Sequence, residues 1–291
     1  MKLQRIITST NNLPNYIQFW PSISQMWKNY GLNIICIFIT DLNEDDELVK
    51  KVKKYGDIML VKPIEGIPDG NLAKIYRILA ASFYFKDEVC TLVDIDQYLL
   101  SNKWLEDCTK DVPDNFIVSP QGTNAYCRYG EKMKNKFPMS YVTAKGSTFH
   151  DIINPNNLSI DDLIKSFYKI SDSIDGKESL SNNKKLKPPY GSGIKGECAG
   201  NFSDESLLRY LMNKWSDKDS RWIKNPPSNC ERYFGKMYAT KRIDRNDSTY
   251  DRKKLNNGEY VDCQPPRPFN DNIDYLKDIL TYLNIGDNYI L

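Results

Sequence analysis

Histidine and closely paired cysteines are almost absent from this sequence. The 291-residue chain has a single histidine, His150, so a mechanism or a metal site that needs two histidines is excluded. Seven cysteines are scattered along the chain without any C-x-x-C pair, which supports neither a disulfide framework nor a structural zinc site. His150 stands at an expected strand-to-helix junction, where we expect a structural role rather than a catalytic one.

Long apolar runs and a strong excess of one charge are also missing. No run approaches the roughly 18 to 20 apolar residues that span a bilayer, and the N-terminus lacks the apolar stretch of a signal peptide. We therefore expect no transmembrane segment and a cytoplasmic location. The 40 Lys and Arg residues against 38 Asp and Glu residues leave a formal charge of +2, which argues against nucleic acid as a partner.

The apolar residues that are present follow a regular order, and at 40% of the chain they suffice for a sizeable core. In the first hundred residues two periods alternate, which is typical of βαβ units around a mostly parallel sheet. Strands are expected at 5–9, 33–39, 58–61, 89–93, 116–118 and 141–143, and helices at 17–30, 45–54, 159–170, 204–215, 272–284 and from 69 onward. The segment 175–200 is rich in Gly, Pro, Ser, Asn and Lys and predicts a mobile loop or lid. The fold class is therefore α/β, with helices flanking a mostly parallel central sheet.

Asp94 and Asp96 form the strongest local signal for chemistry. They directly follow the apolar strand expected at 89–93, at the strand end where open α/β sheets place their ligands. Both carboxylates can reach one hard cation such as Mg²⁺ or Mn²⁺, which would neutralise a diphosphate leaving group. The D-x-D spacing occurs often by chance, and the alternative is two solvated acids in a turn. Against that alternative, carboxylates buried beside a strand are costly without a counter-charge.

Two further pairs of charged residues are candidates for the same site. Lys74 and Arg77 lie three residues apart on the helix that leads to this strand. Three interpretations are open: the two cations bind a phosphate, they hold the aspartates in place, or they belong to a solvated helix face. Asp204 and Glu205 stand at an expected helix start, where the helix dipole favours acids in any case. The functional alternative is that one of these two acids is the general base for an acceptor hydroxyl.

Taken together, these segments resemble the sugar-nucleotide-dependent glycosyltransferases of the GT-A fold. In the first hundred residues the resemblance rests on the strand end T-S-T at 8–10, the helix start I-P-x-G-x-x-x-K-x-x-R at 67–77 and the strand end L-V-D-I-D at 92–96. Further along it rests on F-P-M-S-Y-V-T-A at 137–144, D-E-x-x-L at 204–208, R-I-D-R at 242–245 and D-C-Q-P-P-R-P at 262–268. The resemblance extends from residue 3 to about residue 270. In particular, the chain resembles the small glycosyltransferase modules of large DNA viruses that infect algae. For a viral chain, the location would be the host cytoplasm.

The resemblance implies one GT-A-like domain over residues 1–291, with a nucleotide-binding half at 1–100 and an acceptor-binding half at 101–291 that ends in a helix. It implies a nucleoside-diphosphate sugar as donor, first a UDP-sugar and alternatively a GDP- or dTDP-sugar, and a glycan or glycoprotein hydroxyl as acceptor. The implied reaction is an inverting transfer of a hexose or a pentose.

The same resemblance assigns residues to the donor. Nucleotide contacts are implied at Thr8, Ser9 and Thr10, with Lys74 and Arg77 around the nucleotide or the phosphates and Asp94 on the ribose or the donor sugar.

A cation, Mn²⁺ or Mg²⁺, is implied as cofactor, with Asp94, Asp96, Asp262 and Gln264 as its ligands. Gln264 departs from the family pattern, which has a histidine at this position. An amide is a poorer ligand for a divalent cation, so metal binding is expected to be weak, supplied by Asp262, or partly replaced by basic side chains.

Two other functions stay open on the sequence. A sugar-nucleotidyltransferase shares this fold class but needs a glycine-rich, basic phosphate loop after its first strand, and T-S-T-N-N at 8–12 has neither glycine nor a base. A degenerate, non-catalytic sugar-binding module is the second alternative, which Gln264 leaves open. Slow hydrolysis of the donor without an acceptor would separate an enzyme from a binding module.

Overall fold

The structure is a computed structural model and describes residues 1–119, 125–127, 134–136, 139–170, 203–216, 222–223, 242–245 and 249–286. Its centre is a seven-stranded sheet with the strand order β10-β6-β9-β4-β1-β2-β3. The strands are β1 (Arg5–Asn11), β2 (Asn33–Ile39), β3 (Asp57–Val61), β4 (Val89–Leu92), β6 (Ile117–Val118), β9 (Val142–Lys145) and β10 (Trp222–Ile223). β1 to β4 are parallel, whereas β9 runs antiparallel to both β4 and β6. The predicted α/β class with a mostly parallel sheet is therefore confirmed.

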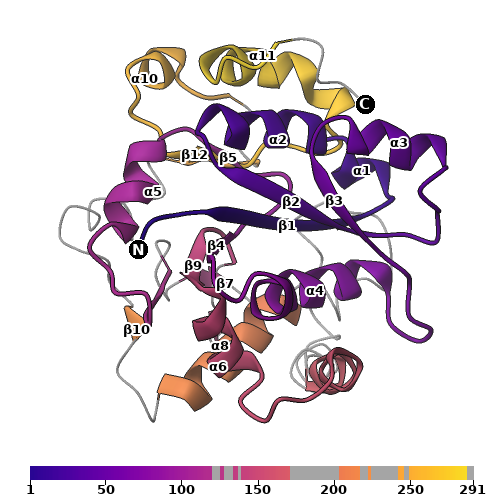
Figure 1. Ribbon diagram of the computed structural model, residues 1–291. Coiled ribbons are helices and arrows are strands. Elements are labelled where there is room, and N and C mark those ends of the chain that lie inside the picture. The colour runs from indigo at the N-terminus through magenta and orange to yellow at the C-terminus, as the bar shows by residue number, and fades with distance from the viewer. Residues whose placement is uncertain are drawn as a thin grey trace, which may run out of the picture.

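Helices cover both faces of this sheet, as Figure 1 shows. On one face lie α1 (Pro14–Ile17), α2 (Trp20–Asn29), α3 (Glu47–Lys53), α10 (Arg252–Asn256) and α11 (Ile273–Tyr282). On the other face lie α4 (Asp69–Tyr84), α6 (Gly146–Ile153) and α8 (Ser203–Ser216), and α5 (Asn102–Thr109) lies at the side. Helical residues 160–170 pack into the same core as α4. The two layers enclose separate apolar cores, one on each face of the sheet.

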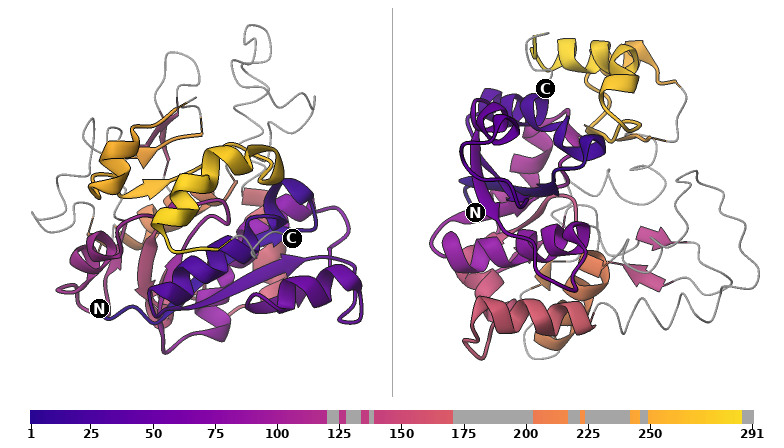
Figure 2. Two further views of the ribbon diagram at one scale, coloured as in Figure 1. Left: turned by 90° about the horizontal axis from the view of Figure 1, so that it is seen from above. Right: turned by 90° about the vertical axis from the view of Figure 1, so that its right-hand side faces the viewer.

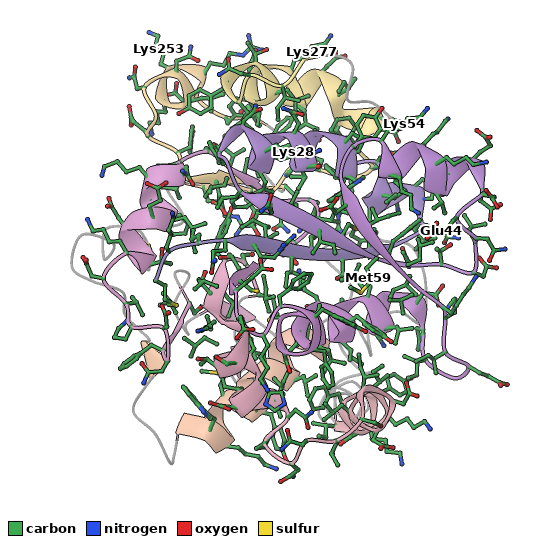
Figure 3. All side chains as sticks on the ribbon, in the orientation of Figure 1. Lys28, Glu44, Lys54, Met59, Lys253 and Lys277 are labelled. Atoms are coloured by element: carbon green, nitrogen blue, oxygen red, sulfur yellow. The ribbon has the colours of Figure 1, made fainter. Side chains whose placement is uncertain are left out.

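The sequence pattern explains most of these elements. β2 reads N-I-I-C-I-F-I, and all of its residues after Asn33 are buried, as expected for a strand that is covered on both faces. Lys28 of α2, Lys253 of α10 and Lys277 of α11 are exposed, and Lys253 and Lys277 lie at the outer edge of the molecule in Figure 3. Figure 2 shows α10 and α11 as the outermost layer, over α2.

Some sequence predictions were wrong in detail. The single helix expected at 17–30 is two helices, because Pro21 lies in the first turn of α2, the place where a missing N–H costs least. His150 lies in the last turn of α6 and not at a strand-to-helix junction. α5, α6 and α10 were not expected at all. The loop expected at 175–200 lies outside the described residues.

Two smaller sheets complete the described structure. The first has the order β11-β12-β5 and consists of β11 (Arg242–Ile243), β12 (Asp262–Cys263) and β5 (Tyr98–Leu99), and the second pairs β7 (Ala125–Cys127) with β8 (Lys134–Lys136). A short 3-10 helix (Asn270–Asn272) leads into α11. No helix among the described residues is both long enough and apolar enough to cross a membrane.

The strand order places a topological switch point between β1 and β4. β1 has β2 on one side and β4 on the other, and all three run in the same direction. The chain leaves β1 towards β2 and β3 and returns to the far side of β1 only with β4. The segments that follow β1 and β4 therefore diverge at the carboxyl edge, which is where open α/β sheets bind ligands.

Gly146 lets α6 start directly against the end of α4. Its backbone N–H donates to the carbonyl oxygen of Glu88 at 2.9 Å. A Cβ atom on Gly146 would lie 2.2 Å from the carbonyl oxygen of Phe85, 2.5 Å from that of Ala81 and 2.7 Å from the Cα atom of Lys86. All three are backbone atoms, so a side chain here requires the two helices to separate.

We predict that Gly146→Ala lowers the free energy of unfolding by about 2 kcal/mol, as overpacking typically does. Gly70→Ala is the matched control, because Gly70 also lies in a helix, but no atom of the described residues beyond its own helical turn lies within 4 Å of its Cβ position. This control should raise the free energy of unfolding by up to about 1 kcal/mol through helix propensity. Urea unfolding followed by circular dichroism measures both, and effects of the same sign would contradict the packing argument.

Candidate functional site

Residues from both sides of the switch point meet at Arg267. Tyr16 lies in α1, just after β1, and Asp96 lies just after β4. Nη1 of Arg267 donates to the hydroxyl of Tyr16, and its guanidinium carbon lies 4.7 Å from the centre of the tyrosine ring. Nε of the same arginine lies 3.5 Å from Oδ2 of Asp96. The carboxyl edge between β1 and β4 is therefore lined by an aromatic ring, a carboxylate and a guanidinium group.

Asp94 is held by Arg77 of α4. The first residue after β4, Val93, continues the pairing with β1 through a hydrogen bond to the carbonyl oxygen of Ile7 at 3.0 Å. Nη1 of Arg77 donates to the carbonyl oxygen of Val93 at 2.8 Å and to Oδ1 of Asp94 at 2.5 Å. Burial opposes the charged form of Asp94, but the guanidinium outweighs it, so the pKa of Asp94 is lower than usual. One third of this side chain stays exposed, which leaves it accessible to a ligand.

The same guanidinium also binds Asp204 in the first turn of α8. Nη2 of Arg77 donates to Oδ2 of Asp204, and both side chains are only 5% exposed. Burial alone would lower the pKa of Arg77, whereas the two carboxylates together raise it. Arg77 therefore does not belong to a solvated helix face, and Lys74 on the same helix is half-buried. Arg77 instead holds Asp94 in place, which was one of the alternatives that the sequence left open.

This geometry does not support Asp204 as the general base. A base must reach the acceptor hydroxyl, but the carboxylate of Asp204 is buried and engaged by Arg77. Its contact makes it a positioning residue for Arg77. The side chain of Glu205 lies outside the described part of the structure.

Asp96 is the more deeply buried member of the pair, with 3% of its surface exposed. Its Oδ1 accepts a hydrogen bond from Nε2 of Gln264 at 3.2 Å. Its Oδ2 lies 3.5 Å from Nε of Arg267 and 3.6 Å from Nη2 of Arg245, and accepts no hydrogen bond within the described residues. Burial raises the pKa of Asp96, and Arg267 offsets this only in part. Two guanidinium groups thus approach one carboxylate oxygen.

The small sheet β11-β12-β5 explains how these residues meet. β12 is antiparallel to β5, with Cys263 opposite Tyr98, so the next residue, Gln264, falls beside the segment that carries Asp96. β11 runs parallel to β12, and the backbone N–H of Gln264 donates to the carbonyl oxygen of Ile243 at 2.8 Å. Arg245 follows this strand and therefore reaches the same place.

Arg242 and Asp262 face each other in the same small sheet. Oδ2 of Asp262 accepts a hydrogen bond from Nε2 of Gln97 at 2.6 Å and lies 3.8 Å from Nη1 of Arg242. Nη2 of Arg242 donates to Oε1 of Gln264, and its Nε lies 3.6 Å from Asp244. The amide of Gln264 therefore bridges Arg242 and Asp96.

The described side chains do not fit a Mn²⁺ or Mg²⁺ ion. Such a cation takes about six oxygen ligands, whereas Oδ1 of Asp94 is held by Arg77 and the amide oxygen of Gln264 by an arginine. Asp262 has no exposed surface and binds another amide. In the part of the chain that the structure covers, no group of three or more His, Cys, Asp or Glu side chains could hold a metal ion. Of the four predicted ligands, Asp96 and Gln264 are in contact, through the amide nitrogen.

The three polar residues expected at the nucleotide lie in β1 itself. The strand continues to Asn11, beyond the expected end at residue 9, so Thr8 lies inside the sheet with no exposed surface. Ser9 is half-buried, and the hydroxyl of Thr10 donates to the carbonyl oxygen of Asn11 at 3.1 Å. Thr10 and Asn11 are thus nearer to the carboxyl edge than Thr8.

Sequence reasoning assigned no role to Tyr16, Arg242, Arg245 or Arg267. The last three lie in segments that carried the family resemblance, but no local pattern connects them with Asp96. One physical argument did point to such residues, because a buried carboxylate after β4 requires a counter-charge. In the described structure these arginines supply that counter-charge.

No protein-family model matches this chain, and no curated protein sequence matches it either. Among solved structures, the galactosyltransferase LgtC with donor and acceptor sugar analogues is similar at 8% identity and a TM-score of 0.46, over 98% of this chain and 99% of that chain. The glycosyltransferase GlyE of Streptococcus pneumoniae TIGR4 is similar at 12% identity and a TM-score of 0.34, over 77% and 66%. The mannosyltransferase PcManGT of Pyrobaculum calidifontis, solved with GDP-Man and Mn²⁺, is similar at 11% identity and a TM-score of 0.31, over 73% and 71%. Similarities at this level assign no role to any residue of the present chain.

We predict that Arg77→Leu lowers the free energy of unfolding by about 3 to 5 kcal/mol, because it leaves two acids without their counter-charge. The double variant Arg77→Leu/Asp204→Leu should be less destabilised than the sum of the two single variants by about 1 kcal/mol or more. Arg5→Leu is the control, since the Arg5–Glu88 pair is more exposed, at 17% and 31%, and should cost about 1 kcal/mol or less. Urea unfolding of the four variants measures this, and simple additivity would show that Arg77 and Asp204 are not coupled.

Proposed function

We propose that this protein is a glycosyltransferase that moves a sugar from a nucleoside-diphosphate donor to a hydroxyl acceptor. The observation that carries the proposal is the meeting of Tyr16, Asp96 and Arg267 at the switch point between β1 and β4. Open α/β sheets bind nucleotides at such a point, and guanidinium groups are the side chains best suited to phosphate. The donor diphosphate would therefore lie at the carboxyl edge of these two strands.

The site offers a suitable partner for each part of a nucleotide sugar. Asp94 is charged, one third exposed and fixed by Arg77, so it can accept hydrogen bonds from hydroxyl groups of the ribose or the donor sugar. Tyr16 is half-buried and presents an aromatic ring for a nucleobase. Lys74 adds positive charge near Asp94. We infer that the nucleotide-binding part consists of residues 1–100 together with the segments 242–245 and 262–268.

Donor, acceptor and stereochemistry follow from the sequence resemblance. A UDP-sugar is the first choice of donor, GDP- and dTDP-sugars are the alternatives, and the acceptor is a hydroxyl of a glycan or a glycoprotein. An inverting transfer needs one base opposite the leaving diphosphate. Because Asp204 is engaged by Arg77, Glu205 is the remaining candidate for that base.

Nucleotide binding and donor hydrolysis test this function. Thermal unfolding in the presence of UDP, GDP and dTDP should show one nucleotide that raises the melting temperature by about 5 to 10 °C at a hundredfold excess over Kd. NMR should then show slow release of free sugar from the matching nucleotide sugar. Stabilisation without sugar release would indicate the non-catalytic binding module, and nucleoside triphosphate consumption with sugar phosphate would indicate the nucleotidyltransferase.

We predict that Asp94→Asn weakens binding of that nucleotide sugar roughly 10- to 100-fold, the range expected for a lost hydrogen bond to a charged group. Asp45→Asn is the matched control, because the Asp45 side chain is fully exposed on the loop before α3. Isothermal titration calorimetry measures both variants. Equal affinities in the two variants would remove Asp94 from the donor site.

A further inference from the structure

We propose that Arg245 and Arg267 take the place of a divalent cation at the donor diphosphate, so that the protein binds its nucleotide without metal. The inference rests on the proposed function and specifies how that site holds phosphate. It starts from the misfit between the described side chains and a metal ion.

The two arginines are turned inward to one point. Lys253 of α10 and Lys277 of α11 are exposed (Figure 3), whereas the side chains of Arg245 and Arg267 are only 27% and 28% exposed. They come from different segments, after β11 and after β12, and converge on Oδ2 of Asp96. Two inward guanidinium groups at a strand end make a built site for an anion.

Their contacts with Asp96 leave hydrogen-bond donors available. The distances of 3.5 and 3.6 Å are longer than hydrogen bonds, and Oδ2 of Asp96 accepts none among the described residues. Asp96 therefore attracts both arginines without using their N–H groups. Arg242 faces Asp244 and Asp262, whereas Arg245 and Arg267 both approach Asp96.

Arg267 is also oriented in advance. The ring of Tyr16 stacks against its guanidinium and the tyrosine hydroxyl accepts from Nη1, while Nε faces Asp96. A guanidinium group that is held from two sides loses little conformational entropy when it binds a phosphate. The guanidinium group of Arg267 would contact a diphosphate placed at the carboxyl edge of β1 and β4.

The described side chains offer a cation no comparable place. The amide oxygen of Gln264 accepts a hydrogen bond from Arg242, and its amide nitrogen donates one to Asp96. Gln264 therefore links an arginine to the buried carboxylate. A divalent ion on the remaining oxygen of Asp96 would stand beside two positive charges. The departure at Gln264 and the arginines thus belong to one arrangement.

Nucleotide titration with and without metal tests the inference. Calorimetry of UDP, GDP and dTDP in EDTA and in MnCl₂ should give Kd values that differ by less than about threefold for the nucleotide that binds. Binding that needs Mn²⁺ overturns the inference and leaves the proposed function intact. If none of the three binds in either buffer, the proposed function fails with it.

Variants test whether the arginines carry the binding. In EDTA, Arg245→Gln and Arg267→Gln should each raise Kd roughly 10- to 100-fold, as expected for charge-assisted hydrogen bonds. Arg5→Gln is the control and should leave Kd unchanged, because Arg5 begins β1, six residues and about 20 Å from its carboxyl end. If Arg267→Gln fails to fold, Arg267→Lys keeps the charge beside Asp96 but loses the fork, and should still weaken binding. Unchanged affinity in the folded variants overturns the assignment.

Discussion

One buried guanidinium group fixes the geometry on which the candidate site depends. Arg77 is nearly inaccessible to water, and its desolvation is offset only because it binds Asp94, Asp204 and the carbonyl oxygen of Val93 together. These partners belong to the end of β4 and to α8, and Asp204 of α8 lies 127 residues after Arg77 in the chain. α4, the sheet and α8 therefore meet around a single charge, and the segment that carries the aspartates is held still before any ligand arrives.

Asp96 is a second buried charge that needs a counter-charge, which here comes from another part of the chain. It too is buried, but its counter-charges come from the small sheet β11-β12-β5, whose strands are only two residues long. Such short strands add little stability by themselves. Their register, however, decides which side chains stand beside Asp96, because a shift of one residue would turn Gln264 and its neighbours to the other face. This part of the fold is therefore specified by the contacts of its polar residues.

The sequence predicted the parts of the fold that local patterns determine. The apolar run of β2 and the stripe of α4 were read correctly because burial on fixed faces imposes a period. The strand-end rule also placed Asp94 and Asp96 correctly after β4. The start of α6 was missed, because it depends on the close approach of Gly146 to backbone atoms of α4, which leaves no periodic signal.

Long-range pairings could not be read in the same way. A stretch such as R-I-D-R has no apolar period, so nothing in it indicates that Arg245 reaches a carboxylate in the first third of the chain. The partner of Asp204 was missed for a related reason: a helix start explains an acid there, but only the tertiary structure shows that Arg77 binds it. What sequence reasoning did supply was the requirement for a counter-charge, without its source.

A carboxylate buried at a strand end can be balanced by a cation from solution or by an arginine of the chain, and the two have different consequences. A bound cation is exchanged with the solvent and is removed by a chelator, whereas a guanidinium is permanent and directional. Because the charge of an arginine is permanent, two arginines side by side repel each other. Asp96 relieves that repulsion, and its shared oxygen accepts no hydrogen bond from the residues that the structure describes. In the proposed site, the carboxylate would keep the two arginines together and leave their donors for an incoming diphosphate, so that a buried acid would have a structural role in anion binding.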